Sequence, residues 1–470
     1  SSTYGADAIG GVINFITKKN FDGVQANVTF GAGQNYNSID TSVIAGTSWE
    51  AGSAYLSYSY SDQDQILNRQ RDFVRKVDWN TGLGFDNACV DPTVSISQST
   101  FVGPPLFFAT TTTTYAAPSY VPNTANHCDN SQDGALLPAM DRENVYANLS
   151  QELTDTLDFN VNAFFSKRDS AADMGPYYGS ARMESQNPYY IDIDGLGSPQ
   201  AVQLSFADHQ DPRIDRTSFE SWGVTAELKK SFQNEWQAKV LLNYGKTESS
   251  YVTPDLNPEL MTSYGQGSSE DNAINFYDIQ STVNSSLIDD LYNYGFVGFA
   301  NNNLKNIRVV ADGPVISLPA GEVRVAFGAE YYEESFSRSQ GTVALTEVGS
   351  LNVQNYDRDV KAVYSEVQIP LIDSINSIPG VKELRVSFAA RYDEYSDFGG
   401  TTNPKIGVTY APNDWASFRA SWGTSFNAPT AVDQLSSQFN TVSVFPSIVV
   451  QNPNDLPNPG SATIVVQGAA

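Results

Sequence analysis

Several long segments of this chain alternate between apolar and polar residues, and this pattern restricts the possible folds more than any other feature. Side chains of a β-strand point alternately to its two faces, so each such segment predicts a strand with one apolar face. Residues 361–369 are ambiguous and are assigned to a strand from their neighbours. The alternation is clear over residues 54–61, 157–166, 222–229, 323–332, 384–393 and 406–410.

The predicted strands run over about 9–15 residues, whereas strands of soluble sandwiches average about 5–6. A tilted strand that crosses a bilayer needs about 9–11 residues, so strand length favours a membrane barrel. Aromatic residues also gather near strand ends, where they predict interfacial girdles or, alternatively, ordinary packing. These residues are Tyr58, Tyr60, Trp222, Trp236, Tyr244, Tyr331, Tyr332, Trp415 and Trp422.

The connections between the predicted strands alternate between short and long. Short turns follow every second strand, at residues 50–53, 154–156, 233–235, 319–321 and 412–414. The intervening loops are often long, at about 62–142, 170–216, 248–303, 338–357 and 427–470. Short turns on one rim and long loops on the other are typical of outer-membrane barrels, whose long loops lie outside the cell. About 13 strands fit between Gly23 and Phe426, an odd number that predicts an unclosed sheet with strands missing at its C-terminal end.

Composition and charge exclude some classes of function. The formal net charge is −26, and a chain this acidic would repel nucleic acid. No run of about 18 apolar residues occurs, so no transmembrane helix is predicted. Motifs of metalloproteases, serine hydrolases and P-loop enzymes do not occur, and Glu333 and Glu334 would point to opposite faces of a strand. We therefore expect no enzyme activity and no cofactor.

Two cysteines, Cys89 and Cys128, lie in one polar segment rich in Thr and Pro. Two cysteines in the same exposed loop predict a disulfide formed in an oxidising compartment such as the periplasm. The neighbouring His127 offers a metal site as an alternative. One His and two Cys without a further ligand nearby make a poor zinc site, so the disulfide is the favoured prediction and no metal is expected.

The N-terminal segment resembles a known family. It reads Tyr4-Gly5-Ala6-Asp7-Ala8-Ile9-Gly10-Gly11-Val12-Ile13-Asn14 and continues to Lys19, which closely resembles the end of the plug domain in TonB-dependent receptors. A second segment, Phe418 to Thr430, resembles a mid-barrel strand of the family that rises into an extracellular loop. Asn427 stands where that family commonly has Arg, so no role of that Arg is carried over.

The resemblance implies an all-β fold, an antiparallel transmembrane β-barrel preceded by the last strand of a plug. Residues 1–20 would end the plug, and residues 21–470 would form a partial barrel with about 13 of about 22 strands. The chain begins at Ser1 without Met and stops within a predicted domain, so we expect a fragment that does not transport alone.

The implied function is active uptake, across the outer membrane of a Gram-negative bacterium, of a scarce nutrient such as a ferric siderophore or an oligosaccharide. The implied partners are outer-membrane lipid, the TonB–ExbB–ExbD energy-coupling complex and a small-molecule or oligosaccharide ligand. A passive or substrate-specific porin is the alternative.

Candidate ligand contacts lie in the long loop at 170–216. Paired tyrosines beside amides suit stacking on sugar rings or on aromatic siderophores. The alternative is that these tyrosines pack the loops against one another. The candidates are Tyr177, Tyr178, Asn187, Tyr189 and Tyr190.

Overall fold

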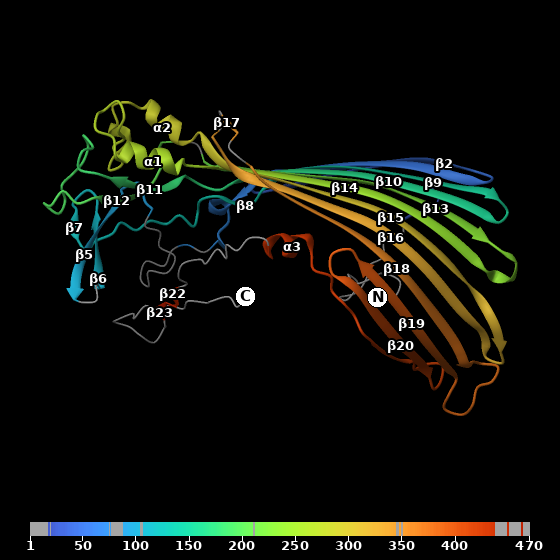
Figure 1. Cartoon of the computed structure of the whole chain (residues 1–470). Coiled ribbons are helices and arrows are strands. Elements are labelled where there is room, and N and C mark those ends of the chain that lie inside the picture. Colours follow the sequence, from blue (N-terminus) through green and yellow to red (C-terminus); the bar gives the residue numbers. More distant parts are fainter. Residues whose placement is uncertain are drawn as a thin grey trace.

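The computed structural model describes residues 17–18, 20–74, 76, 88–103, 107–209, 212–344, 347–348, 351–437, 449–450 and 462–463. Most of the described strands belong to one large antiparallel sheet, which is long, twisted and curved, with a smaller folded unit at one end (Figure 1). Among the described residues, no helix is long and apolar enough to cross a membrane.

The large sheet is a meander in which sequence neighbours are also spatial neighbours. The path runs from β1 at one edge to β21 at the other, and its 13 strands confirm the expected number. In spatial order they are β1 (Gly23–Gly33), β2 (Tyr36–Trp49), β3 (Gly52–Gln63), β9 (Ala139–Thr154), β10 (Leu157–Asp173), β13 (Ile214–Ser231), β14 (Gln237–Asp255), β15 (Tyr294–Leu318), β16 (Gly321–Ala344), β18 (Asn352–Ile372), β19 (Glu383–Tyr395), β20 (Gly399–Ala411) and β21 (Phe418–Gly423).

Smaller elements lie in the connections between these strands. A five-stranded sheet contains β5 (Thr93–Gly103), β6 (Phe107–Ala116), β7 (Val121–Pro122), β11 (Tyr178–Met183) and β12 (Gln200–Ser205). Two further pairs join β4 (Ile66–Leu67) to β8 (Ala135–Leu137) and β22 (Val449–Val450) to β23 (Ala462–Thr463), and β17 (Glu347–Val348) pairs with β16. The α-helices are α1 (Pro258–Gly265), α2 (Ser286–Leu291) and α3 (Ala431–Ser437). Short 3-10 turns occupy Asn68–Gln70, Gln233–Glu235 and Ile279–Ser281.

Several strands are longer than predicted. β15 has 25 residues and β16 has 24, because their pairing continues past the end of the alternating segments. The connection between β14 and β15 therefore narrows to residues 256–293, which corrects the expected loop at 248–303. Residues 361–369, ambiguous in sequence, lie within β18.

The two faces of the sheet differ in chemistry. On one face Val161 lies opposite Leu149 and Ala226, and the row continues through exposed apolar side chains such as Leu242 and Ile307. The other face is polar and linked by hydrogen bonds: Asn160 Nδ2 donates to Ser150 Oγ (2.7 Å), and Thr225 Oγ1 donates to Asn243 Oδ1 (3.1 Å). An apolar outer face and a polar inner face are what a barrel wall in a bilayer requires. α3 lies in the concavity of the sheet, so the polar face against which its segment packs is the concave one (Figure 1).

Aromatic rings mark one boundary of the apolar face. The rings of Trp222 and Tyr244 lie 5.2 Å apart on this face, and Tyr331 follows in the same band. On each of these two strands the next residue of the same face, two positions along the chain, is charged. Lys246 comes after Tyr244, and Glu333 comes after Tyr331. This sequence of apolar, aromatic and charged side chains is the profile of a membrane interface. Tyr332 is an exception among the expected girdle residues, because it packs on the concave face beside Val360, Tyr395 and Ala428.

Arginine substitutions on the two faces should have different costs. In the full-length protein refolded into phospholipid vesicles, Val161→Arg would place a charge in lipid. It should lower the free energy of unfolding by about 2–4 kcal/mol. Asn162→Arg, on the next residue but on the concave face, should change it by less than about 1 kcal/mol. Equal effects of the two variants in denaturant titrations would contradict the assignment of the faces.

Candidate functional site

Three long connections fold together into one unit at the end of the sheet, here called the cap. The cap comprises the described residues of 64–138, 174–213 and 256–293. Its sheet draws strands from two of these connections, in the order β11-β12-β5-β6-β7, and α1 packs against β11. The long loops predicted from sequence are thus a folded structure, although they are far apart along the chain.

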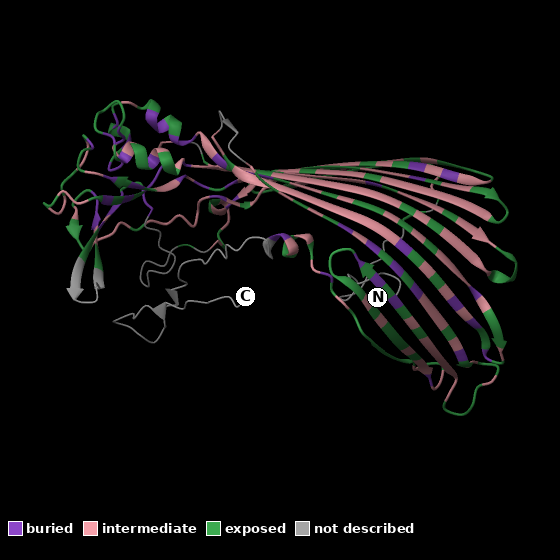
Figure 2. Cartoon of the chain, viewed as in Figure 1, coloured by how far each residue is buried: buried purple, intermediate pink, exposed green. Residues whose placement is uncertain are grey.

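The cap has its own hydrophobic core. Phe206, Phe276 and Leu291 are buried almost completely, and buried side chains come from all three connections. Figure 2 shows this concentration of buried residues at the cap end of the molecule, whereas most of the large sheet is intermediate or exposed. Burying a large apolar side chain contributes about 1.5–3 kcal/mol, so the core holds the three connections together. Further core residues are Val94, Ile96, Met183, Val202, Leu204, Ile274 and Ile288.

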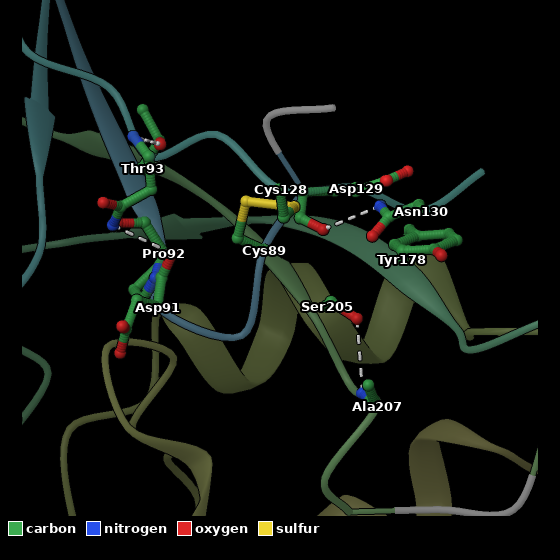
Figure 3. The surroundings of a disulfide bond; sticks show 12 residues. Cys89, Asp91, Pro92, Thr93, Cys128, Asp129, Asn130, Tyr178, Ser205 and Ala207 are labelled. Atoms are coloured by element: carbon green, nitrogen blue, oxygen red, sulfur yellow. Dashed lines mark hydrogen bonds between the residues drawn. A yellow bond between two sulfur atoms is a disulfide. The ribbon is translucent and has the colours of Figure 1, made fainter. Parts of the chain in front are cut away.

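A disulfide closes a loop within the first connection. Cys89 and Cys128 are joined, with their Cα atoms 5.7 Å apart and a separation of 39 positions in the sequence (Figure 3). Backbone contact then ties this connection to the second, because Ser205 N donates to Cys89 O (2.8 Å). Tyr178 also links the two, since its hydroxyl donates to Asp133 Oδ2 (3.2 Å). Among the described residues, no group of three or more His, Cys, Asp or Glu side chains is arranged to hold a metal ion.

The five candidate ligand residues lie within the cap and make contacts inside it. Asn187 is 3% exposed and its Nδ2 donates to Tyr264 O (3.1 Å), which ties the second connection to the third. The Tyr177 ring packs on Tyr292 with centroids 5.0 Å apart. Their contact with a ligand stays a prediction. The remaining hydrogen bonds are Tyr189 Oη accepting from Val283 N (3.0 Å), Tyr190 Oη donating to Ser198 O (2.7 Å) and Tyr178 Oη donating to Asp133.

A pocket of about 620 Å³ lies on the concave face, where the chain after β21 turns back toward the sheet. Arg358 on β18 holds this returning segment by donating from Nη1 to Pro429 O (3.1 Å). Ala428 packs beside the buried side chains of Val360 and Tyr395. The pocket therefore has the polar wall on one side and the segment leading into α3 on the other. Its wall side chains include Phe164, Asn243, Thr247, Asn302, Phe336 and Tyr356.

The charged side chains of the concave wall are paired with one another. Glu330 is 8% exposed and accepts from Asn306 Nδ2 (2.7 Å), Arg308 Nε (3.0 Å) and Arg391 Nη2 (3.0 Å). Arg391 Nε also donates to Asp393 Oδ1 (2.7 Å). Closely hydrogen-bonded partners offset much of the cost of burying such charges.

A second charged group borders the pocket. Arg358 is paired with Glu334 and lies 3.7 Å from Asp397. Glu333, the neighbour of Glu334, points to the convex face and pairs with Lys305 (3.2 Å). The two adjacent carboxylates therefore lie on opposite faces, as predicted. Sequence reasoning did not identify Arg358, Phe336 or Tyr356 as pocket residues, although alternation along β18 would have placed Tyr356 and Arg358 on one face.

The plug-end motif, Tyr4, Gly5, Ala8, Ile9, Gly10, Gly11, Val12, Ile13 and Asn14, lies outside the described residues. The residues just after it contact the concave wall at β3 and β9. Tyr55 Oη donates to Lys18 O (2.9 Å), and Ser53 Oγ bonds with Asn20 Oδ1 (2.9 Å). Tyr146 Oη and Thr17 Oγ1 are 3.3 Å apart. The chain therefore reaches β1 along the inner face of the sheet.

A comparison with known protein families finds a match that covers most of the strands of the large sheet. The family described as "TonB dependent receptor-like, beta-barrel" matches residues 145–460. The chain belongs to this family. TonB-dependent receptors are receptors and transporters of the outer membrane of Gram-negative bacteria rather than enzymes. A comparison with curated proteins found no match.

Solved structures similar to the chain include receptors and an importer. A mutant ferric enterobactin receptor from Pseudomonas aeruginosa, in complex with enterobactin, has 15% identity and a TM-score of 0.47, over 91% of this chain and 48% of that one. The siderophore receptor of Acinetobacter baumannii has 14% identity and a TM-score of 0.47, over 91% and 47%. The RagAB peptide importer has 10% identity and a TM-score of 0.45, over 91% and 39%. The chain thus spans about half the length of these receptors or less.

Tyr277 offers a test of the cap core. Its hydroxyl donates to the fully buried Gln200 Oε1 (2.7 Å), and burial raises the pKa of Tyr277 and of Tyr292. A raised tyrosine pKa means that its stabilising contribution is complete below the unfolded pKa of about 10 and is lost as pH rises further. In the full-length protein, hydrogen exchange should show the cap amides losing protection above about pH 10.

Tyr277→Phe should cost the cap about 1–3 kcal/mol at neutral pH, because Gln200 Oε1 loses its buried donor. An absorbance titration of the tyrosines should also show one hydroxyl fewer with a raised pKa. The control is Tyr251→Phe on β14, whose ring is 38% exposed and which should leave cap protection unchanged. Unchanged cap exchange in Tyr277→Phe would contradict the packing described.

Proposed function

We propose that this chain forms part of an outer-membrane receptor that binds a scarce nutrient and takes it up by TonB-dependent transport. The observation that carries the proposal is the difference in chemistry between the two faces of the sheet. Its convex face is apolar and bounded by aromatic rings, while its polar concave face bears a pocket. A wall of this kind separates lipid from a hydrated lumen, and family membership supports the receptor assignment.

Each part of the structure has a role in this proposal. Strands paired on both sides satisfy their backbone polar groups inside the lipid layer. The outer edges of β1 and β21 would pair with further strands of the barrel. The cap faces the outside of the cell and would make the first contact with the nutrient, since loops on a rigid scaffold commonly carry recognition. The concave pocket would hold the nutrient inside the lumen. Transport of this kind makes and breaks no covalent bond in the nutrient.

The proposal also assigns two parts of the chain to the plug and the barrel of such a receptor. Residues 1–20 would be the last part of a plug, and residues 21–470 part of the barrel that surrounds it. The contacts of Thr17, Lys18 and Asn20 with the concave wall support a plug that lies inside the sheet. A passive porin is the second candidate, and a plug contacting TonB is what distinguishes the receptor from it. The energy-coupling partner would be the TonB–ExbB–ExbD complex, reached through a segment upstream of the plug.

Orientation in the membrane can be tested by chymotrypsin digestion of intact cells that carry the full-length protein. Phe73 and Leu196 are exposed in the cap, at 76% and 71%, and cleavage is expected at such sites. Phe232 and Trp415, exposed at 53% and 86%, lie at the opposite rim and should be cut only after the cells are permeabilised. Cleavage at Trp415 in intact cells would contradict the outward position of the cap.

Coupling can be tested by photo-crosslinking in cells. A photoreactive amino acid placed upstream of Tyr4 in the full-length protein should capture TonB. The same amino acid at the exposed Val283 of the cap should not, because the cap faces away from the periplasm. A porin predicts no TonB adduct at any upstream position, so the absence of adducts in correctly inserted protein would favour the porin.

A further inference from the structure

The pocket on the concave face combines aromatic rings with neutral polar side chains. Phe164 is 45% exposed although the wall around it is polar, and Phe336 and Tyr356 line the same pocket. Amides and hydroxyls lie beside these rings, at Asn243, Asn302, Thr247, Ser221 and Thr430. Exposed rings next to hydrogen-bonding groups suit a ligand that has apolar ring faces and polar edges.

The charges at the pocket are balanced. Arg358 is paired with Glu334 and lies near Asp397. An anionic ligand at this wall would have to compete with these carboxylates for Arg358, and like charges brought together in an interface are costly.

The route to the pocket is strongly acidic. Among the described residues of the cap, 15 Asp and Glu residues stand against 5 Lys and Arg residues. The connection at 256–293 alone holds six of the acidic residues and no Lys or Arg. A negative field at the mouth of a cleft lowers the local concentration of anions and slows their association. An uncharged solute is indifferent to this field.

We propose that the pocket binds an uncharged, polyhydroxylated ring compound, that is, a neutral oligosaccharide, and disfavours anionic ferric chelates. Sugar rings would stack on Phe164 and Phe336, and their hydroxyls would exchange hydrogen bonds with the neighbouring amides. Asn243 Oδ1 already accepts from Thr225, so Asn243 would act chiefly as a donor to the sugar. This inference rests on the proposed function and narrows its substrate to one class.

The test is competitive binding to the purified full-length protein. The probes are a panel of short neutral oligosaccharides from starch, cellulose, xylan and galactan, together with ferric enterobactin as the anionic chelate. Native mass spectrometry should retain at least one neutral oligosaccharide, and its affinity should change less than about twofold between low and high salt. Tighter retention of ferric enterobactin than of any sugar would overturn the proposal.

Variants of the aromatic residues in the concave pocket test whether the sugar binds there. Phe164→Ala and Phe336→Ala should each weaken binding of the retained sugar about tenfold, a loss equivalent to about 1.4 kcal/mol. The matched control is Phe327→Ala, a ring that is 52% exposed on the convex face and should leave affinity unchanged. Unchanged affinity in both pocket variants would place the sugar elsewhere and overturn the inference.

The experiments distinguish an incorrect substrate class from an incorrect proposed function. If no neutral oligosaccharide is retained while TonB is still captured upstream of Tyr4, the substrate class is wrong and the receptor function stands. If TonB is not captured either, the proposed function fails together with this inference.

Discussion

The pairing of backbone polar groups in a medium without water is the constraint on which this structure depends. A strand in lipid has no other source of hydrogen bonds, so every N–H and C=O must find a neighbouring strand. The strands between β1 and β21 meet this demand in a simple meander, in which β10, for example, pairs along its length with β9 and β13. The alternation of side chains follows from it, because a strand fixed between two others presents one face to lipid and one to the lumen.

The meander also places the long connections where they can cooperate. Antiparallel strands send alternate connections to the same rim, so the connections after β3, β10 and β14 emerge as near neighbours. Their apolar residues then share one core, which the Cys89–Cys128 disulfide and the buried side chain of Asn187 reinforce. The three connections therefore form one folded cap, and the concave wall of the sheet holds the pocket residues Phe164, Tyr356 and Arg358.

The wall was predictable from sequence and the cap was not, for a physical reason. The number of strands and the direction in which their side chains face follow from a local rule, which holds wherever one side of a strand meets lipid, as at Val161. Contacts in the cap are non-local, and no local pattern shows that Tyr177 of one connection packs on Tyr292 of another. The ends of β15 and β16 were not predicted, because outside the lipid layer neither face of a strand meets lipid and its side chains need not alternate. Arg358 was missed because its partners Glu334 and Pro429 lie on other elements.

The most direct test of this account is a scan of β10 in the full-length protein with single nitroxide spin labels at positions 157–165. Collision rates with oxygen report lipid, and those with a water-soluble nickel chelate report the lumen. The account predicts that oxygen access peaks at Leu157, Phe159, Val161, Ala163 and Phe165, and that nickel access peaks at the positions between them. A profile without a period of two residues, or with the opposite phase, would contradict a one-sided strand in a membrane barrel.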